Sequence, residues 1–148
     1  MTVEICYGDL FAQRDADALG HGVNCCGLMG AGIARAFRAR WPQMFAAYQQ
    51  RCRGGPNRLT PGTMMEYWLP DGRLIYNLAT QDRPGPFARY DWLERSVGAM
   101  MLHAERHHLR KVAIPKIGSG IGGLQWPLVA EKLHAVADPS PVTLVVVI

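Results

Sequence analysis

The sequence lacks the features that mark a membrane protein, a secreted protein or a zinc protein. No apolar run approaches the roughly 20 residues that a membrane-spanning helix needs, and residues 1–7 contain neither a basic nor an apolar segment typical of a secretion signal. The four cysteines form no C-x-x-C pair and have no zinc-ligand spacing. We therefore expect a soluble, cytoplasmic protein with reduced thiols, no bound metal and no membrane partner.

Charge is neither extreme nor concentrated in one block. The chain has 16 Lys and Arg against 12 Asp and Glu, a net charge of +4, and a pI of about 9.1. The basic residues are scattered, so this balance favours anionic ligands in general and is weak evidence for nucleic acid. With 148 residues, 49% apolar and 19% charged, the composition predicts one globular domain spanning residues 1–148.

The chain does contain a glycine-rich loop between a strand pattern and a helix pattern. A β-branched run at 112–117 leads into four glycines within 118–123, and Pro127 follows in a position favoured in the first turn of a helix. Glycine lets several backbone N–H groups converge on one anion beside a helix N-terminus. The loop therefore predicts a phosphate cradle, with a tight turn of no function as the alternative.

Two familiar nucleotide motifs fit this loop poorly. Gly118-x-Gly120-x-x-Gly123 matches the dinucleotide fingerprint, but that fingerprint needs a further βαβ unit and an acid about 20 residues on to hold a ribose. The next apolar run, 142–148, carries no carboxylate side chain before the sequence stops. A Walker loop is excluded because no Gly-Lys-Ser/Thr occurs.

A second glycine loop precedes another helix pattern. The strand pattern at 16–24 opens into residues 25–33, and apolar residues then recur at helical spacing to Trp41. Two such loops suit a ligand with two phosphates, or with a phosphate and a sugar. Asn24, just before the loop, is a candidate hydrogen-bond partner for a ribose hydroxyl or a simple turn former. Asp9, after a strand pattern at 3–7, is a candidate acceptor for the amino group of a base or a turn cap.

The remaining patterns complete an α/β fold. Runs 64–69 and 74–79 flank a turn and predict a hairpin. Helix patterns begin at Pro42 and at Asp91, where Asp91 to Glu94 resembles a capping box. The apolar run 142–148 predicts a strand covered on both faces. About six strands and four helices result, arranged as a three-layer α/β/α sandwich around a mixed sheet.

We expect the histidines and cysteines to have structural rather than catalytic roles. His21 is expected to be a satisfied core or edge residue, and His103 and His107, at i and i+4, to be exposed residues at a helix end rather than metal ligands. Cys6 and Cys52 are expected in the core. Redox chemistry at Cys25-Cys26 is disfavoured, because adjacent cysteines rarely form a relaxed disulfide, and we expect these two to line the pocket.

Three ordered motifs strongly resemble the macrodomain family, and more narrowly its branch of terminal ADP-ribose protein glycohydrolase and DNA ADP-ribosyl glycohydrolase antitoxins. The resemblance covers nearly the whole chain. The residues that carry it are Gly8-Asp9-Leu10, Val23-Asn24 with Met29-Gly30-Ala31-Gly32-Ile33-Ala34, and Pro115-Lys116-Ile117-Gly118-Ser119-Gly120 with Gly123-Leu124-Gln125-Trp126.

The resemblance implies a mixed sheet between helices that binds ADP-ribose across its strand ends, without a cofactor. By similarity, Asp9 would hold the adenine amino group, Leu10 would lie nearby, Ile148 would close the adenine pocket, and Asn24 would face the distal ribose. The two glycine loops would supply the other contacts to the diphosphate and distal ribose: Gly30, Ala31, Gly32, Ile33, Lys116, Ile117, Gly118, Ser119, Gly120, Ile121 and Gly122.

The sequence departs from this branch at its catalytic positions. The branch uses a lysine after the Tyr-x-Leu strand and an acid in the second glycine loop, where this chain has Gln81 and Gly122. An amide cannot form the lysine adduct, although the adjacent Asp82 and Arg83 could partly substitute for the lysine. The candidate catalytic residues are Gln81, Asp82 and Asn24. We expect either a hydrolase that removes ester-linked ADP-ribose from acidic side chains or deacylates O-acyl-ADP-ribose, or a binding module that recognises ADP-ribose without turnover. The expected partners are ADP-ribose or ADP-ribosylated protein, with ADP-ribosylated nucleic acid left open.

Overall fold

Strands form at the apolar runs of the sequence, and all of them join one sheet. The computed structural model describes residues 3–148. The strands are β1 (Val3–Cys6), β2 (Ala18–Val23), β3 (Met64–Trp68), β4 (Leu74–Ala79), β5 (Lys111–Ile114) and β6 (Thr143–Val147). Within the described residues they form a six-stranded sheet in the order β1-β6-β5-β2-β4-β3.

The sheet is mixed because a hairpin adds its last strand. β3 pairs antiparallel with β4 through the predicted turn, whereas every other neighbouring pair is parallel. β4 is buried at all six positions, and β6 is buried from Leu144 to Val147. Buried parallel strands require cover on both faces, and the helices provide it.

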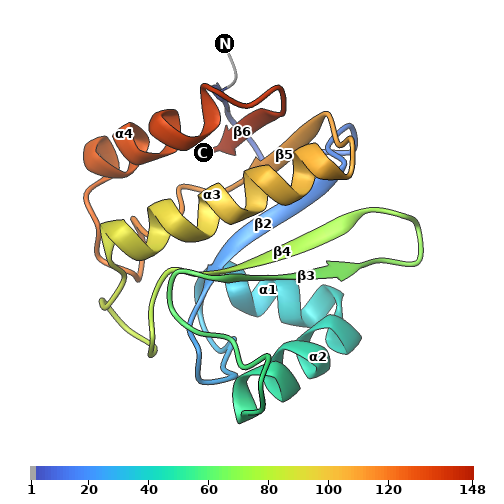
Figure 1. The fold of residues 1–148 in the computed structure, drawn as a ribbon, viewed down its shortest axis with the longest axis vertical. Helices are drawn as coiled ribbons and strands as arrows, with labels where there is room; N and C mark the ends of the chain where they lie inside the picture. Colours follow the sequence, from blue (N-terminus) through green and yellow to red (C-terminus); the bar gives the residue numbers. More distant parts are fainter. Residues whose placement is uncertain (1–2) are drawn as a thin grey trace.

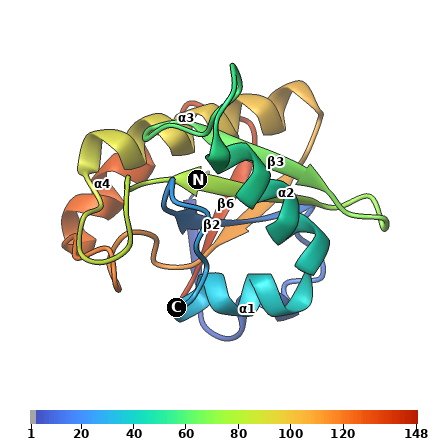
Figure 2. The same ribbon diagram turned by 90° about the horizontal axis from the view of Figure 1, so that it is seen from below.

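The helices lie in two layers, one on each side of the sheet (Figures 1 and 2). They are α1 (Gly32–Arg40), α2 (Pro42–Arg53), α3 (Tyr90–Arg106) and α4 (Trp126–Ala137), with a short 3₁₀ turn at Leu10–Ala12. Phe37 and Tyr48, from α1 and α2, pack into one apolar cluster, and Met100 and Leu133, from α3 and α4, pack into the other. The predicted α/β/α sandwich with a mixed sheet is confirmed.

The carboxyl ends of the parallel strands meet at one edge, where β2 and β5 part. These two strands pair only at Ala18 with Val112 and at Leu19 with Ala113. Beyond this point the chain leaves β2 towards α1 on one face and leaves β5 towards α4 on the other. Such a switch point is where open α/β sheets bind their ligands, and both glycine loops begin here.

Two local predictions were wrong. Asp91 does not cap α3: that helix starts at Tyr90 after Arg89, and Asp91 lies in its first turn. The Arg89 side chain makes no cap hydrogen bond either, and the Tyr90 hydroxyl accepts a hydrogen bond from the N–H of Gln125 at 3.0 Å. Cys6 is only half-buried because it lies on the edge strand β1. No helix within residues 3–148 has the length and apolar character that crossing a bilayer requires.

Candidate functional site

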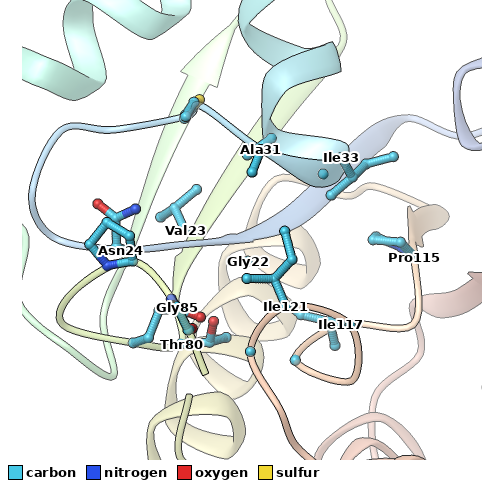
Figure 3. Close-up of a pocket in the computed structure, with 18 of the residues that line it drawn as sticks. Gly22, Val23, Asn24, Ala31, Ile33, Thr80, Gly85, Pro115, Ile117 and Ile121 are labelled. Atoms are coloured by element: carbon cyan, nitrogen blue, oxygen red, sulfur yellow. Dashed lines mark hydrogen bonds between the residues drawn. The ribbon is translucent and has the colours of Figure 1, made fainter. Parts of the chain in front are cut away.

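A cavity of about 710 Å³ opens where β2 and β5 part (Figure 3). This volume lies within the range of roughly 300–1,000 Å³ typical of small-molecule sites. Both glycine loops and the end of β4 line it: Gly22, Val23, Asn24, Leu28, Met29, Gly30, Ala31, Gly32, Ile33, Ala34, Thr80, Gln81, Pro84, Gly85, Pro115, Lys116, Ile117, Gly118, Ser119, Gly120, Ile121 and Gly122. Asn24, Thr80 and Gly85 group at one end of the cavity, and Ile33 and Pro115 lie at the other.

The first glycine loop presents the N-terminus of α1 to the cavity. Ala31 is the N-cap residue and provides no side-chain acceptor. Among the described residues, none accepts from the N–H groups of Gly32, Ile33 or Ala34, and all three residues line the cavity. Free N–H groups and the positive end of the helix dipole favour an anion at this position.

The second glycine loop closes on itself and leaves other N–H groups free. Gly123 N–H donates to Gly120 and Leu124 N–H to Gly118, at 3.1 and 2.8 Å. No described residue accepts from the N–H groups of Gly120 or Ile121. Gly118 has φ +73°, and a Cβ there would lie 3.0 Å from the side chain of Leu124. This loop therefore requires glycine at 118 and offers unpaired donors beside the first loop.

The two loops touch each other across the cavity. A Cβ on Gly32, where φ is +58°, would lie 3.0 Å from Cδ1 of Ile121, and Ile121 is 53% exposed. Lys116 is the one charged residue among the described residues that line the cavity. Its ammonium lies 5.3 Å from the centre of the Trp126 ring, a cation–π contact. The polar lining thus combines backbone donors and one cation with the side chains of Asn24, Thr80, Gln81 and Ser119, and the donors and the cation suit a phosphorylated ligand.

Three of the predicted ligand-binding residues lie outside this cavity. Asp9, Leu10 and Ile148 are absent from its lining but gather at the neighbouring ends of β1 and β6. Gly8 N–H donates to the Ile148 carbonyl at 3.2 Å. Asp9 is exposed and caps the 3₁₀ turn, its Oδ1 accepting from Phe11 N–H at 2.9 Å, whereas Leu10 is buried. These residues extend the strand-end edge beyond the end of the cavity marked by Ile33 and Pro115.

A family model described as Macro domain matches residues 21–133 of the chain. The chain belongs to the Macro domain family. It is 30% identical over 139 residues to the ADP-ribose glycohydrolase OARD1 of Homo sapiens, covering 94% of this chain and 86% of that protein. It is 32% identical over 135 residues to the DNA ADP-ribosyl glycohydrolase of Mycobacterium tuberculosis, covering 90% of this chain and 38% of that protein.

Solved structures agree with these relatives. The macrodomain of Mycobacterium tuberculosis DarG superposes with a TM-score of 0.85 at 30% identity, covering 98% of this chain and 96% of that chain. The macrodomain of Thermus aquaticus DarG superposes with a TM-score of 0.84 at 26% identity, covering 98% and 96%. This macrodomain spans about two fifths of the length of the DNA ADP-ribosyl glycohydrolases that it matches.

Gln81 fastens the loop that follows β4 in this macrodomain. Its Nε2 donates to the carbonyls of Arg83 and Gly85, at 2.7 and 3.0 Å, so both amide hydrogens are used inside the loop. Gly122 lies against it: a Cβ at 122 would be 2.9 Å from Ala88 Cβ and 3.3 Å from Gln81 Oε1. An acidic side chain at 122 does not fit without movement of this wall. Asp82, another candidate catalytic residue, is exposed and does not line the cavity.

Asn24 shapes the first loop through hydrogen bonds of its side chain. Its Oδ1 accepts from Cys26 N–H at 2.9 Å and from the Tyr48 hydroxyl at 3.0 Å, and its Nδ2 donates to the Leu28 carbonyl at 2.9 Å. Asn24 is 8% exposed and lines the cavity. The turn-forming interpretation of this residue therefore has direct support, alongside its place at the cavity wall.

The prediction that Cys25 and Cys26 line the pocket was wrong. The turn made by Asn24 directs them behind the loop, where the Cys25 thiol donates to the Gln81 carbonyl at 3.6 Å and the Cys26 thiol to the Asp82 carbonyl at 3.4 Å. Burial raises the pKa of Cys25 to about 12, which removes thiolate chemistry at neutral pH. The pair instead ties the first loop to the segment after β4.

The histidines differ in part from expectation. His21 is fully buried, donates from Nε2 to Asn77 Oδ1 at 2.7 Å and stacks on Phe37 at 3.8 Å, although its Nδ1 has no partner among the described residues. His103 is half-buried rather than exposed, because its ring lies between the Tyr76 hydroxyl (2.7 Å) and Glu66 (3.2 Å). Within residues 3–148, no group of three or more His, Cys, Asp or Glu is placed to hold a metal ion.

Proposed function

We propose that this macrodomain binds ADP-ribose across the strand ends and hydrolyses ester-linked ADP-ribose. The observation that carries the proposal is the pair of facing donor sets: the free N–H groups of Gly32, Ile33 and Ala34 on one loop, and of Gly120 and Ile121 on the other. Two sets of backbone donors on either side of one cavity match the two phosphates of a diphosphate. The names of the glycohydrolase relatives support the same ligand.

The proposed orientation follows the edge of the sheet. The adenine lies near Asp9, Leu10 and Ile148, the diphosphate between the glycine loops, and the distal ribose near Asn24 and Gln81. Asp9 is exposed and already ordered by its bond to Phe11, so its carboxylate has room for a further donor such as an adenine amino group. We predict that Asp9→Asn, which keeps an acceptor for Phe11, weakens ADP-ribose binding measurably by calorimetry.

The proposed reaction is hydrolysis of the ester between the ribose and a carboxylic acid. Water attacks the anomeric carbon of the distal ribose, the bond from that carbon to the carboxylate oxygen breaks, and the products are ADP-ribose, a carboxylate and a proton. A carboxylate is a better leaving group than the nitrogen of an N-glycosidic bond, so this linkage needs less assistance from the protein. Because Gln81 has no amine and Gly122 no carboxyl group, we assign no covalent intermediate to the enzyme. The bound diphosphate and backbone donors would position the water.

A reader without turnover is the second candidate. One observation favours it: of the described residues that line the cavity, none is an acid or a histidine, and the Gln81 amide is occupied by carbonyls. Contacts that bind substrate and transition state equally give affinity but no rate. The two candidates share the ligand and differ only in turnover.

Release of ADP-ribose separates the two candidates. We would incubate the protein with glutamate-linked mono-ADP-ribosylated protein and measure free ADP-ribose, with Gly120→Glu as the control. A Cβ at Gly120 meets nothing within 4 Å, so this variant should fold normally while its carboxylate repels the diphosphate. Release by the wild type alone supports the hydrolase. Binding without release supports the reader, and absence of binding refutes both.

A further inference from the structure

The loop after β4, residues 81–88, forms a rim at one end of the cavity. Gln81 holds it through the two carbonyls of Arg83 and Gly85. Gly85 has φ +105°, and a Cβ there would lie 3.0 Å from Cε2 of Phe87, so the ring packs directly onto the glycine. Backbone hydrogen bonds from Phe87 to Gly85 and from Ala88 to Gly122 complete the loop, at 2.9 and 3.2 Å. Side chains on this rim therefore project from a fixed backbone.

The rim carries a guanidinium held flat on an aromatic ring. The Cζ atom of Arg83 lies 4.0 Å from the centre of the Phe87 ring, which is a cation–π contact. The Arg83 side chain is 62% exposed, and its Nε forms a long ion pair with Asp82 Oδ1 at 3.9 Å, beyond hydrogen-bond distance. Stacking fixes the plane of the guanidinium and leaves its N–H edges facing solvent. Such a fork matches the two oxygens of a carboxylate.

The rim lies at the end of the cavity where the group attached to ADP-ribose would emerge. Asn24, Thr80 and Gly85 mark one end of the cavity in Figure 3, and Arg83 lies between two residues of its lining, Gln81 and Pro84. This step rests on the proposed function: with the distal ribose at this end, whatever is attached to it leaves the cavity over the rim.

We infer that Arg83, stacked on Phe87, recognises a carboxylate of an acidic peptide segment that flanks the ADP-ribosylated residue. A nucleic-acid strand fits the rim less well. Single-stranded nucleic acid needs a track of cations and free aromatic faces, whereas Phe87 is already covered by Arg83. One planar guanidinium is suited to a single carboxylate rather than to a polyanion.

Two peptides that differ only in their flanks test the inference. Both carry one glutamate-linked ADP-ribose; in one the neighbouring residues are Asp and Glu, in the other Ser and Gln. The variant is Arg83→Gln, which keeps the backbone carbonyl that Gln81 binds. The matched control is Arg38→Gln, which removes a guanidinium stacked on Phe45 at 4.4 Å and away from the cavity lining. We would measure Kd for each peptide and for free ADP-ribose, and kcat/KM where release occurs.

The wild type should prefer the acidic peptide, and Arg83→Gln should weaken its binding about fivefold to tenfold. The neutral peptide and free ADP-ribose should change less than about twofold, as should every ligand with Arg38→Gln. Equal losses for both peptides would overturn the inference while leaving the proposed function intact. A loss confined to an ADP-ribosylated oligonucleotide would overturn it in favour of nucleic acid. Failure of the wild type to bind free ADP-ribose would remove the proposed function and the inference together.

Discussion

An aspartate at the N-cap of α1 should make the protein more stable and its ligand binding weaker. Ala31 is among the poorest N-cap residues, and the N–H groups that it leaves free are those we assign to a phosphate. In Ala31→Asp, the new carboxylate would accept from Ile33 or Ala34 N–H and occupy the same place as the anion. If the first glycine loop only connected β2 to α1, Ala31→Asp would raise stability without weakening ligand binding.

The gain in stability and the loss of binding can both be estimated from the N-cap substitution. Replacing alanine by a good N-cap residue contributes about 0.5–2 kcal/mol to the free energy of unfolding, and a carboxylate at the positive end of the helix adds about 0.3–1 kcal/mol. For a chain of this size, each kcal/mol raises Tm by about 2–4 °C. Losing a charge-assisted hydrogen bond costs about 1.5–3 kcal/mol of binding, which corresponds to a Kd about 10- to 150-fold higher.

Thermal unfolding and calorimetric titration with ADP-ribose measure the two effects. Gln125→Asp is the matched control, because Gln125 is the uncapped N-cap of α4 and lies outside the cavity. Gln125→Asp should raise Tm less than Ala31→Asp does, because Pro127 has no N–H for the new carboxylate to accept from. The Kd of Gln125→Asp for ADP-ribose should not change. If Ala31→Asp raises Tm yet binds ADP-ribose like the wild type, the N-terminus of α1 does not hold the phosphate.

Four further substitutions probe the cavity wall and the core. Gly122→Ala should lower the free energy of unfolding by about 1–3 kcal/mol because its Cβ meets Ala88, whereas Gly120→Ala should change it by less than about 0.5 kcal/mol; equal Tm values for both would contradict the contact. Gln81→Glu places a carboxylate against two carbonyls, so stability and turnover should both fall, while a rise in turnover would identify residue 81 as a base. Burial lowers the pKa of His21 to about 4 from 6.5, so the folded state binds fewer protons than the unfolded state. The free energy of unfolding should therefore decrease by about 2 kcal/mol from pH 7 to pH 5. Urea titrations should show that the free energy of unfolding of His21→Phe depends less on pH, and an unchanged pH dependence would refute this assignment.

The elements that could be predicted are those fixed by local pattern. The buried run of β6, the hairpin of β3 and β4, and both glycine loops are visible in the sequence, because strand burial and φ > 0 each demand particular residue types. Gly22 gave a weaker signal: a glycine inside a strand marks a close approach, and here it lines the cavity, though it was not assigned to the site. Gly85 likewise became meaningful only when Phe87 was seen packed on it.

What could not be predicted depends on particular side-chain contacts, some local and some distant in the sequence. Gln81 was singled out for chemistry by its position after β4, yet its amide binds its own loop, whose path no local pattern specifies. His103 is half-buried because Glu66 and Tyr76 come to it from the sheet. Cys26 turns away from the cavity because the Asn24 side chain accepts its N–H. In each case a specific contact overrides the expectation based on residue type.

The short pairing between β2 and β5 has a consequence for how the protein opens. Only two residues of each strand are in register there, so this boundary divides the sheet into two better-paired groups, β1-β6-β5 and β2-β4-β3. An anion held by both glycine loops would act as a removable cross-link across the boundary, with a stabilisation that grows as RT ln(1 + [L]/Kd). Amide hydrogen exchange should then slow together in β2 and β5 as ligand is added, while the outer strands β1 and β3 respond less.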